Sequence, residues 1–281
     1  MTDHDPAVTV VVDDVHVTYR VPSDEPDEEA GRPNRARRLL GRARGHSSHT
    51  IVPALKGISV VAREGESIGV LGRNGSGKST LLRAIAGLTV PTRGRVLADG
   101  TPVLLGVSAA LMPNLSGSRN VILGGLAMGL SREEVEARYD EVVDLASIGA
   151  AIHRPMRTYS SGMSARLSFA IATAARPHVL LVDEALNTGD AEFRARSEER
   201  MNDLRAHAGT VFLVSHSLAT VEETCTRVLW IDAGILRVDG PVDKVVGAYR
   251  EYFTRWRKAR EKNRRRPLPP WEEGSDIPMP V

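Results

Sequence analysis

The chain has 281 residues, a formal net charge of +2 and 42% hydrophobic residues, which is enough for one large domain or two small ones with a proper core. Its charge is segregated: residues 255–266 hold eight basic side chains against one acid, and this argues against the evenly basic surface of a general nucleic-acid binder. Cys225 is the only cysteine, so neither a disulfide framework nor a cysteine-based metal site is expected. The sequence has no secretory signal pattern and no apolar run long enough to span a bilayer. We therefore expect a cytosolic protein that reaches a membrane only through a partner.

The N-terminal part of the chain carries strand and turn patterns. AVTVVV and VHVTYR are rich in β-branched residues and predict strands, and ALKGISVVAREGESIGVLG predicts further strands with a turn at Glu64 and Gly65. Residues 22–50 interrupt this pattern with acids and then arginines. We expect an inserted, exposed segment there, with a short basic helix over residues 35–44. KSTLLRAIAGL then predicts a helix that ends near Gly87.

The C-terminal part alternates helices with strands. Helical spacing dominates over about residues 107–165, where Ser131 and Glu134 form a candidate capping box. RPHVLLVDE and GTVFLVSH predict buried strands, separated by a charged helix over about residues 191–206. This alternation predicts an α/β fold with a largely parallel sheet. Residues 251–281 form a basic, proline-rich tail that we expect to start as a basic helix at about residue 253. Contact with anionic lipid or a partner and a plain solvated charge run are equal alternatives for its role.

A glycine-rich loop supplies the clearest chemical signal. GRNGSGKST fits the phosphate-loop pattern G-x-x-x-x-G-K-[ST], and it stands between a predicted apolar strand and a predicted helix. Glycines allow backbone N–H groups to approach phosphate oxygens, Lys78 would neutralise the β- and γ-phosphates, and the Ser79 hydroxyl would bind Mg²⁺. The predicted nucleotide-binding residues of this loop are Gly72, Asn74, Gly75, Ser76, Gly77, Lys78, Ser79 and Thr80.

Two predicted strands end in groups that suit phosphoryl transfer. Asp183 and Glu184 follow VLLV at the carboxyl edge of the predicted sheet, where open α/β folds bind ligands. Asp183 would hold the Mg²⁺ shell and Glu184 would be the general base for the attacking water. His216 follows the strand TVFLVS, at another predicted strand end. Ordinary solvated acids and a purely structural histidine are the alternatives for these positions.

Together these motifs resemble the nucleotide-binding domain of an ABC transporter over about residues 8–250, and we expect this domain to occupy residues 1–250. The resemblance implies a P-loop NTPase fold of the ABC type, with a mostly parallel core sheet, an antiparallel β subdomain and a helical subdomain over about residues 107–165. It also identifies YSSGM as the family signature, whose commoner form is L-S-G-G-Q. In that family two subunits pack head to tail, and the signature of one caps the γ-phosphate bound by the other. Ser160, Ser161 and Gly162 would supply this cap, and Asp190 matches the family's interface loop. The resemblance also implies that His216 is the sensor of the γ-phosphate.

RTYSSGMSARLSFAIA and DEALNTGDAEF narrow the resemblance to ATPase subunits of polysaccharide exporters, of the O-antigen, teichoic acid or mycobacterial galactan type. This implies ATP and Mg²⁺ as cofactors, a second copy of the chain, a separate transmembrane permease and a lipid-linked glycan as substrate, with no nucleic acid. It places the chain at the cytoplasmic face of the cytoplasmic membrane, held peripherally by the permease. Tyr19 matches the aromatic residue that stacks on adenine, although a buried strand tyrosine is an alternative. The excess of arginine over lysine favours an actinobacterial galactan exporter.

One departure from the family pattern concerns the glutamine that contacts Mg²⁺ at the edge of the helical subdomain. The sequence contains no glutamine, and the corresponding position falls on Val107, beside Ser108. The Ser108 hydroxyl or a water would have to replace it. An ABC transporter ATPase for another cargo, or a soluble ABC ATPase, are the alternative functions.

Overall fold

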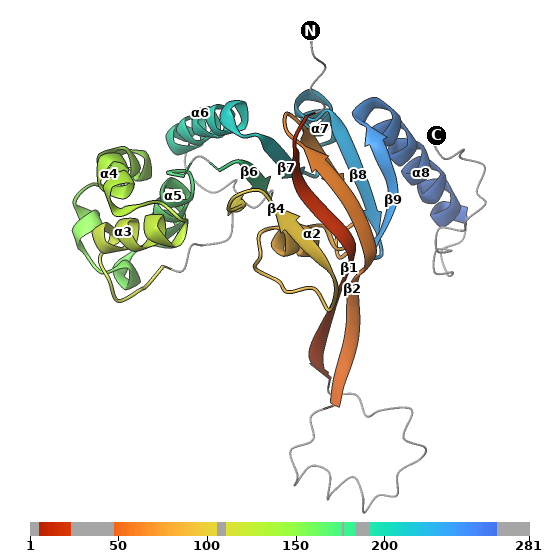
Figure 1. The fold of residues 1–281 in the computed structure, drawn as a ribbon, viewed down its shortest axis with the longest axis horizontal. Helices are drawn as coiled ribbons and strands as arrows, with labels where there is room; N and C mark the ends of the chain where they lie inside the picture. The colour runs from red at the N-terminus through yellow and green to blue at the C-terminus, as the bar shows by residue number, and fades with distance from the viewer. Residues whose placement is uncertain (1–5, 24–47, 106–110, 176, 184–190, 263–281) are drawn as a thin grey trace, which may run out of the picture.

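The computed structural model describes residues 6–23, 48–105, 111–175, 177–183 and 191–262. Its strands form two sheets, one of three strands in the order β2-β1-β4 and one of six strands in the order β5-β6-β7-β3-β8-β9. Figure 1 shows the smaller sheet crossing in front of the larger one, with helices on either side of the two sheets. The predicted α/β fold with a separate antiparallel sheet is confirmed.

The six-stranded sheet carries the core of the fold. Its strands are β5 (Val103–Leu105), β6 (Val179–Val182), β7 (Thr210–Val214), β3 (Ser67–Leu71), β8 (Arg227–Asp232) and β9 (Ile235–Pro241). The first five are parallel to one another, and β9 pairs antiparallel with β8. The carboxyl ends of β6, β7 and β3 therefore meet at one edge, with β7 in the middle.

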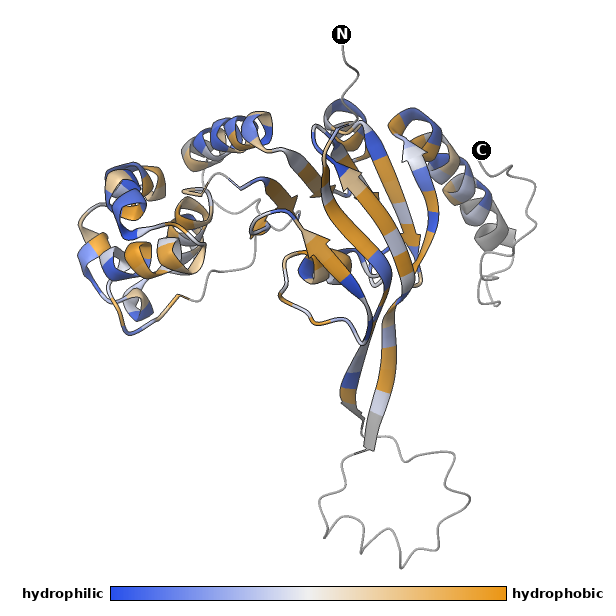
Figure 2. Ribbon diagram, viewed as in Figure 1, coloured by the Kyte–Doolittle hydropathy of each residue, from blue (hydrophilic) through white to orange (hydrophobic). Residues whose placement is uncertain are grey.

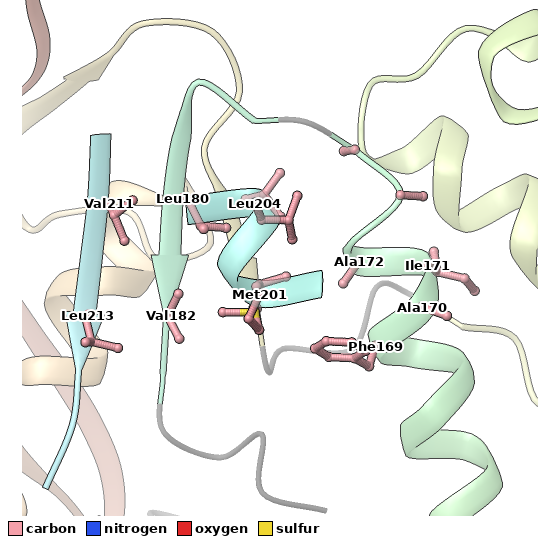
Figure 3. Packing of buried hydrophobic residues seen from close by; sticks show 14 of the residues in the cluster. Phe169, Ala170, Ile171, Ala172, Leu180, Val182, Met201, Leu204, Val211 and Leu213 are labelled. Atoms are coloured by element: carbon pink, nitrogen blue, oxygen red, sulfur yellow. The ribbon is translucent and has the colours of Figure 1, made fainter. Parts of the chain in front are cut away.

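These strands are apolar throughout because both faces of the sheet are covered. In β6, Leu180 and Val182 belong to one buried cluster, whereas Val179 and Leu181 belong to another. Buried residues of helices α5 (Ser161–Ala172) and α6 (Ala191–His207) belong to the first cluster. Buried residues of α2 (Lys78–Ile85) and of the three-stranded sheet belong to the second. Figure 3 shows Met201 of α6 between Val182 and Phe169 of α5. Figure 2 shows the hydrophobic residues concentrated in the strands, whereas α6 is largely hydrophilic.

The three-stranded sheet is built on one long hairpin. Strand β1 (Val8–Ser23) pairs with β2 (Ser48–Arg63) along its full length, while β4 (Arg93–Ala98) pairs with β1 only as far as His16. The hairpin therefore projects as a two-stranded arm beyond β4 (Figure 1). The two strands continue into both ends of the segment expected as an insertion, residues 22–50. Its remainder, including the predicted helix over residues 35–44, lies outside the described residues.

Three helices and two short 3-10 turns form the helical subdomain. They are α3 (Gly117–Ala127), α4 (Arg132–Ala146), η1 (Gly149–His153), η2 (Met156–Thr158) and α5. The capping box predicted at the start of α4 is present, since Ser131 accepts from the N–H of Glu134 and the Glu134 carboxylate accepts from the N–H of Ser131. Helix α5 runs past the expected limit at residue 165 because Leu167, Phe169 and Ile171 are buried in the core.

The C-terminal helices pack on the far end of the large sheet. Helix α7 (Leu218–Thr224) precedes β8, and α8 (Val242–Lys262) follows β9. The expected start of a tail at residue 251 falls inside α8, because aromatic residues on both sides of that point pack on the same buried tryptophan, Trp230. Within the part of the chain that the structure describes, no helix has both the length and the apolar character needed to cross a bilayer.

Candidate functional site

The glycine-rich loop leaves the buried strand β3 and leads directly into α2. Gly72 and Gly77 both have backbone angles in the left-handed region, with φ of 153° and 108°. A Cβ atom at Gly72 would lie 2.1 Å from the Ile231 carbonyl oxygen, and one at Gly77 would lie 2.7 Å from the Ala54 carbonyl oxygen. Glycine is therefore required at both positions by the backbone angle and by the close approach of neighbouring backbone.

The loop presents hydrogen-bonding groups that suit an anion. Lys78 is 7% exposed, and its Nζ atom donates to the carbonyls of Gly72 at 2.8 Å and Arg73 at 3.0 Å. The buried Oγ atom of Ser76 has no hydrogen-bond partner among the described residues. Gly77 stands at the N-cap of α2 without a side-chain cap, so the positive end of this helix dipole is not neutralised by its own sequence. This arrangement can bind phosphate.

The turn between β8 and β9 holds the loop against the three-stranded sheet. The N–H of Gly234 donates to the Ser76 carbonyl at 2.9 Å, and the Gly234 carbonyl accepts from the N–H of Lys56 at 2.9 Å. Gly234 has φ of 83°, and a Cβ atom there would lie 2.7 Å from the Ala54 carbonyl oxygen. This connection was not predicted, although the glycine of DAGI was a local signal for a tight turn.

The large sheet places the predicted acid and histidine next to the loop. Asp183 directly follows β6 and His216 lies two residues after β7, and β7 pairs with β3 on its other side. Asp183 is half-buried and His216 is exposed. The three strand ends therefore gather Asp183, His216 and the glycine-rich loop at one sheet edge. Glu184 and Asp190 lie outside the described residues, as do Val107 and Ser108.

The candidate site offers few protein ligands for Mg²⁺, and this ion needs only a few. Among the described residues there is no cluster of three or more histidine, cysteine or acidic side chains that could hold a metal. Mg²⁺ keeps several waters and takes one or two protein ligands together with substrate phosphates. The Ser79 hydroxyl at the start of α2 and the Asp183 carboxylate provide hard oxygen ligands of that kind. The donor set therefore fits Mg²⁺ bound with a nucleotide.

The predicted signature turn begins α5. The Ser160 Oγ atom accepts a hydrogen bond from the N–H of Met163, so Ser160 is the N-cap, and Ser161 is the first helical residue. The hydroxyl of Tyr159 donates to the Ala151 carbonyl at 2.7 Å, and burial raises the pKa of this phenol. Tyr159 thus fixes the turn to η1.

The structure does not bring the signature turn to the glycine-rich loop of the same chain. Helix α5 lies with α3 and α4 in the helical subdomain, whereas α2 lies between the two sheets (Figure 1). Gly162 is exposed, and a Cβ atom there would meet only the Ser160 Oγ atom, at 3.9 Å. Nothing described in this chain requires glycine at that position.

Tyr19 lies on the projecting arm at the side of the loop. It is 39% exposed and pairs across the hairpin with Val52, which is 43% exposed. Two residues further along β2, Ala54 contacts the turn at Gly234 and approaches Gly77. The alternative of a buried strand tyrosine is therefore excluded, and an aromatic face is available beside the loop.

An aromatic row on α8 was missed by the sequence analysis. Tyr249 and Tyr252 pack on Trp230 with ring centroids 5.4 Å and 5.1 Å apart, and Phe253 links this pair to Trp256. Burial raises the pKa values of Tyr249 and Tyr252, and nearby Asp232 raises them further. Their spacing of three, four and seven residues is the signal of a single buried helix face.

Comparison with known proteins decides the family. The family model described as ABC transporter matches residues 55–187. A teichoic acids export ATP-binding protein of Staphylococcus saprophyticus is 36% identical over 73% of this chain and 78% of its own length. The chain belongs to the ABC transporter family.

Two further curated relatives of this ABC protein carry export names. An O-antigen export system ATP-binding protein of Myxococcus xanthus is 41% identical over 76% of the chain. A teichoic acids export ATP-binding protein of Bacillus anthracis is 39% identical over 75% of it. The matches cover 49% and 39% of these two relatives, so the chain spans half or less of their length.

Solved structures confirm the ABC fold. A dimeric post-hydrolysis ATP-binding cassette bound to ADP and phosphate superposes with a TM-score of 0.60 and 22% identity, covering 83% of this chain and 98% of the other. An ATP-binding subunit of an ABC transporter gives a TM-score of 0.62 at 21% identity, covering 86% and 93%. At this identity the likeness establishes the fold alone.

Proposed function

We propose that the chain binds and hydrolyses ATP as the motor subunit of an ABC exporter. The observation that carries this proposal is the glycine-rich loop, in which Lys78, the buried Ser76 hydroxyl and the uncapped start of α2 form an anion cradle. The predicted nucleotide contacts are Gly72 and residues 74–80, with the ring of Tyr19 stacked on the adenine. The exposure of the Tyr19 side chain on the projecting arm supports that role.

The sheet edge supports a division of roles in hydrolysis. Glu184 accepts a proton from water as the water oxygen attacks the γ-phosphorus and the bond to the ADP oxygen breaks. His216 contacts the γ-phosphate, and Lys78 stabilises the charge that develops on it. Ser79 and Asp183 would hold Mg²⁺, which when bound neutralises phosphate charge.

A second copy of the chain completes each site in this proposal. Ser160, Ser161 and Gly162 of one copy would face the γ-phosphate held by the other, and Asp190 would lie at the interface between copies. Gly162 supports this role, because a glycine is unfavourable in a helix and no neighbour among the described residues requires one there. The free space over Gly162 suits close approach by a ligand held on another molecule.

The cargo is proposed from the relatives. Their names specify export of O-antigen and teichoic acids, and we infer that this chain drives export of a lipid-linked polysaccharide of the galactan or O-antigen type through a separate permease. The chain would then sit at the cytoplasmic face of the membrane. Depletion of the protein in its own cells, followed by mass spectrometry of lipid-linked glycans, tests this. A polymer on a polyprenyl carrier should accumulate inside the cell; an unchanged glycan pool would point to another cargo.

ATP turnover tests the enzymatic part directly. The purified chain should hydrolyse ATP only with Mg²⁺, and Lys78→Ala should abolish both nucleotide binding and turnover. Lys56→Ala is the matched control, since Lys56 lies nearby on β2 but contributes its backbone rather than its ammonium group to the loop contact. Equal loss of ATP binding in both variants would contradict the assignment of Lys78.

A further inference from the structure

Trp256 of helix α8 contacts the glycine-rich loop. The guanidinium carbon of Arg73 lies 5.2 Å from the centroid of the Trp256 ring, a cation–π contact between the second residue of the loop and the outer part of α8. Both side chains belong to the described part of the chain: Arg73 is exposed and Trp256 is half-buried.

The same helix is anchored at the strand that feeds the loop. Trp230, on which Tyr249 and Tyr252 pack, is paired in register with Leu71, the last residue of β3. Trp230 is 2% exposed, so the surface on which Tyr249 and Tyr252 of α8 pack is held in place by the core around it. Helix α8 therefore contacts both the strand end at Leu71, through Trp230, and the loop side chain at Arg73.

The backbone of Arg73 explains why its side chain matters. Its carbonyl accepts hydrogen bonds from the Lys78 ammonium group at 3.0 Å and from the N–H of Ser76 at 3.1 Å. A guanidinium group fixed on an aromatic ring restricts rotation of this residue, and it thereby keeps the carbonyl in place for Lys78. A loop ordered in advance loses less conformational entropy when a ligand binds.

We propose that Trp256 is a positioning residue for nucleotide binding, acting through Arg73 on the conformation of the glycine-rich loop. This inference rests on the proposed binding of ATP. It gives α8 a role in nucleotide affinity that the sequence of the glycine-rich loop alone does not indicate. Loss of the contact should raise the Kd and the KM for ATP while kcat stays nearly constant, because the reacting groups at the sheet edge are untouched.

The test compares two substitutions of the same ring. Trp256→Phe keeps an aromatic face for Arg73, whereas Trp256→Leu keeps apolar bulk for packing against Phe253 but has no π-system. With a fluorescent N-methylanthraniloyl ATP as the probe, Trp256→Leu should weaken binding about two- to fivefold, as expected for an exposed cation–π contact, and Trp256→Phe should restore most of the affinity. Thermal melting of both variants would establish that α8 remains packed.

A double-mutant cycle assigns the effect to the pair. Arg73→Met removes the charge and should weaken binding as much as Trp256→Leu does, and the double variant should be no weaker than either single variant. Wild-type affinity in Trp256→Leu, equal losses in the Leu and Phe variants, or fully additive losses would each overturn the inference. Probe binding by the wild-type chain separates the two proposals: its absence would refute ATP binding itself and this inference with it, whereas wild-type binding that Trp256→Leu leaves unchanged would refute this inference alone.

Discussion

The Ser160 side-chain oxygen accepts a hydrogen bond from the backbone N–H of Met163, with 3.2 Å between the two atoms. The signature turn is therefore already formed in a single chain, capped by its own serine and fixed to η1 by Tyr159. A preformed turn can be offered to a second copy without a folding step. Its first helical residues, Ser161 and Gly162, are exposed.

Gly162→Ala should separate stability from turnover. The new methyl group has room within this chain, and alanine favours helix over glycine by about 0.5–1 kcal/mol, so the melting temperature should be unchanged or slightly higher. ATP hydrolysis should fall at least about tenfold if a γ-phosphate approaches this glycine closely in the dimer. Unchanged turnover would contradict the proposed role of Gly162.

A second glycine provides the matched control for that variant. At Gly125 in α3, a Cβ atom would lie 2.6 Å from a Val135 methyl carbon. Gly125→Ala should therefore lower the melting temperature through crowding of α3 against α4. Gly162→Ala should therefore keep or raise the melting temperature, whereas Gly125→Ala should lower it. Thermal melting of both variants would record this difference.

Ser160→Ala and Ser131→Ala remove the same kind of helix cap from the same subdomain. Each serine accepts a hydrogen bond from the third N–H of its helix, and loss of an N-cap costs about 1 kcal/mol. Both variants should therefore show similar losses of stability in chemical denaturation. Only Ser160→Ala should lower ATP turnover, with ATP affinity of the monomer unchanged. A similar loss of turnover in both variants would show that Ser160 acts only as a structural helix cap.

Arg227 holds the far end of the sheet by two ion pairs. Its guanidinium group contacts Glu66 at 3.0 Å and Asp239 at 2.6 Å, and all three side chains are less than 30% exposed. These carboxylates hold the pKa of Arg227 above its usual range. Arg227→Ala leaves both acids without their partner, and it should lower the free energy of unfolding by about 1–3 kcal/mol.

An exposed pair on α8 is the control for Arg227. Arg255 contacts Glu251 one turn earlier in the helix, and both side chains are more than half exposed. Arg255→Ala should change the free energy of unfolding by less than about 0.5 kcal/mol. Equal effects of the two substitutions in urea unfolding would show that the Arg227 pairs add nothing beyond a surface contact.

Glu184→Gln should leave ATP binding intact and stop turnover, because the amide cannot accept the proton from water. The variant should accumulate as an ATP-bound dimer in size-exclusion chromatography, whereas the wild-type chain returns to monomer after hydrolysis. Normal turnover by this variant would show that another group is the base. A conservative change of a carboxylate to an amide keeps the side-chain shape, so loss of folding is not expected.

Much of the fold could be predicted because its signals are local. Continuous apolar runs such as VLLV identify strands covered on both faces, and the Ser131–Glu134 capping box sets the start of α4. The glycine-rich loop was placed correctly between a strand and a helix because its flanking patterns are unambiguous. The functional roles assigned to its residues remain predictions.

The sequence did not predict contacts between segments that lie far apart in the chain. The hydrogen bond from Gly234 to Ser76 and the stacking of Arg73 on Trp256 each depend on how β8, β9 and α8 return to the loop. The start of the expected tail was predicted as a basic helix, and α8 does continue to Lys262; its aromatic face packed on Trp230 was not predicted. An aromatic stripe shares this helix with the exposed Arg250 and Arg255, and periodicity distinguishes the two faces only once the packing partner, Trp230, is known.

Mixing two inactive variants tests most directly the claim that two copies share each nucleotide site. Lys78→Ala removes the phosphate-binding lysine, and Gly162→Asp places a carboxylate where the γ-phosphate of the other copy would lie, at a helix start that tolerates acids. Each variant alone should be inactive, since both of its sites contain the defect. Their mixture should recover ATP hydrolysis, because a mixed dimer pairs one intact loop with one intact signature turn. A mixture as inactive as its components would contradict the shared site.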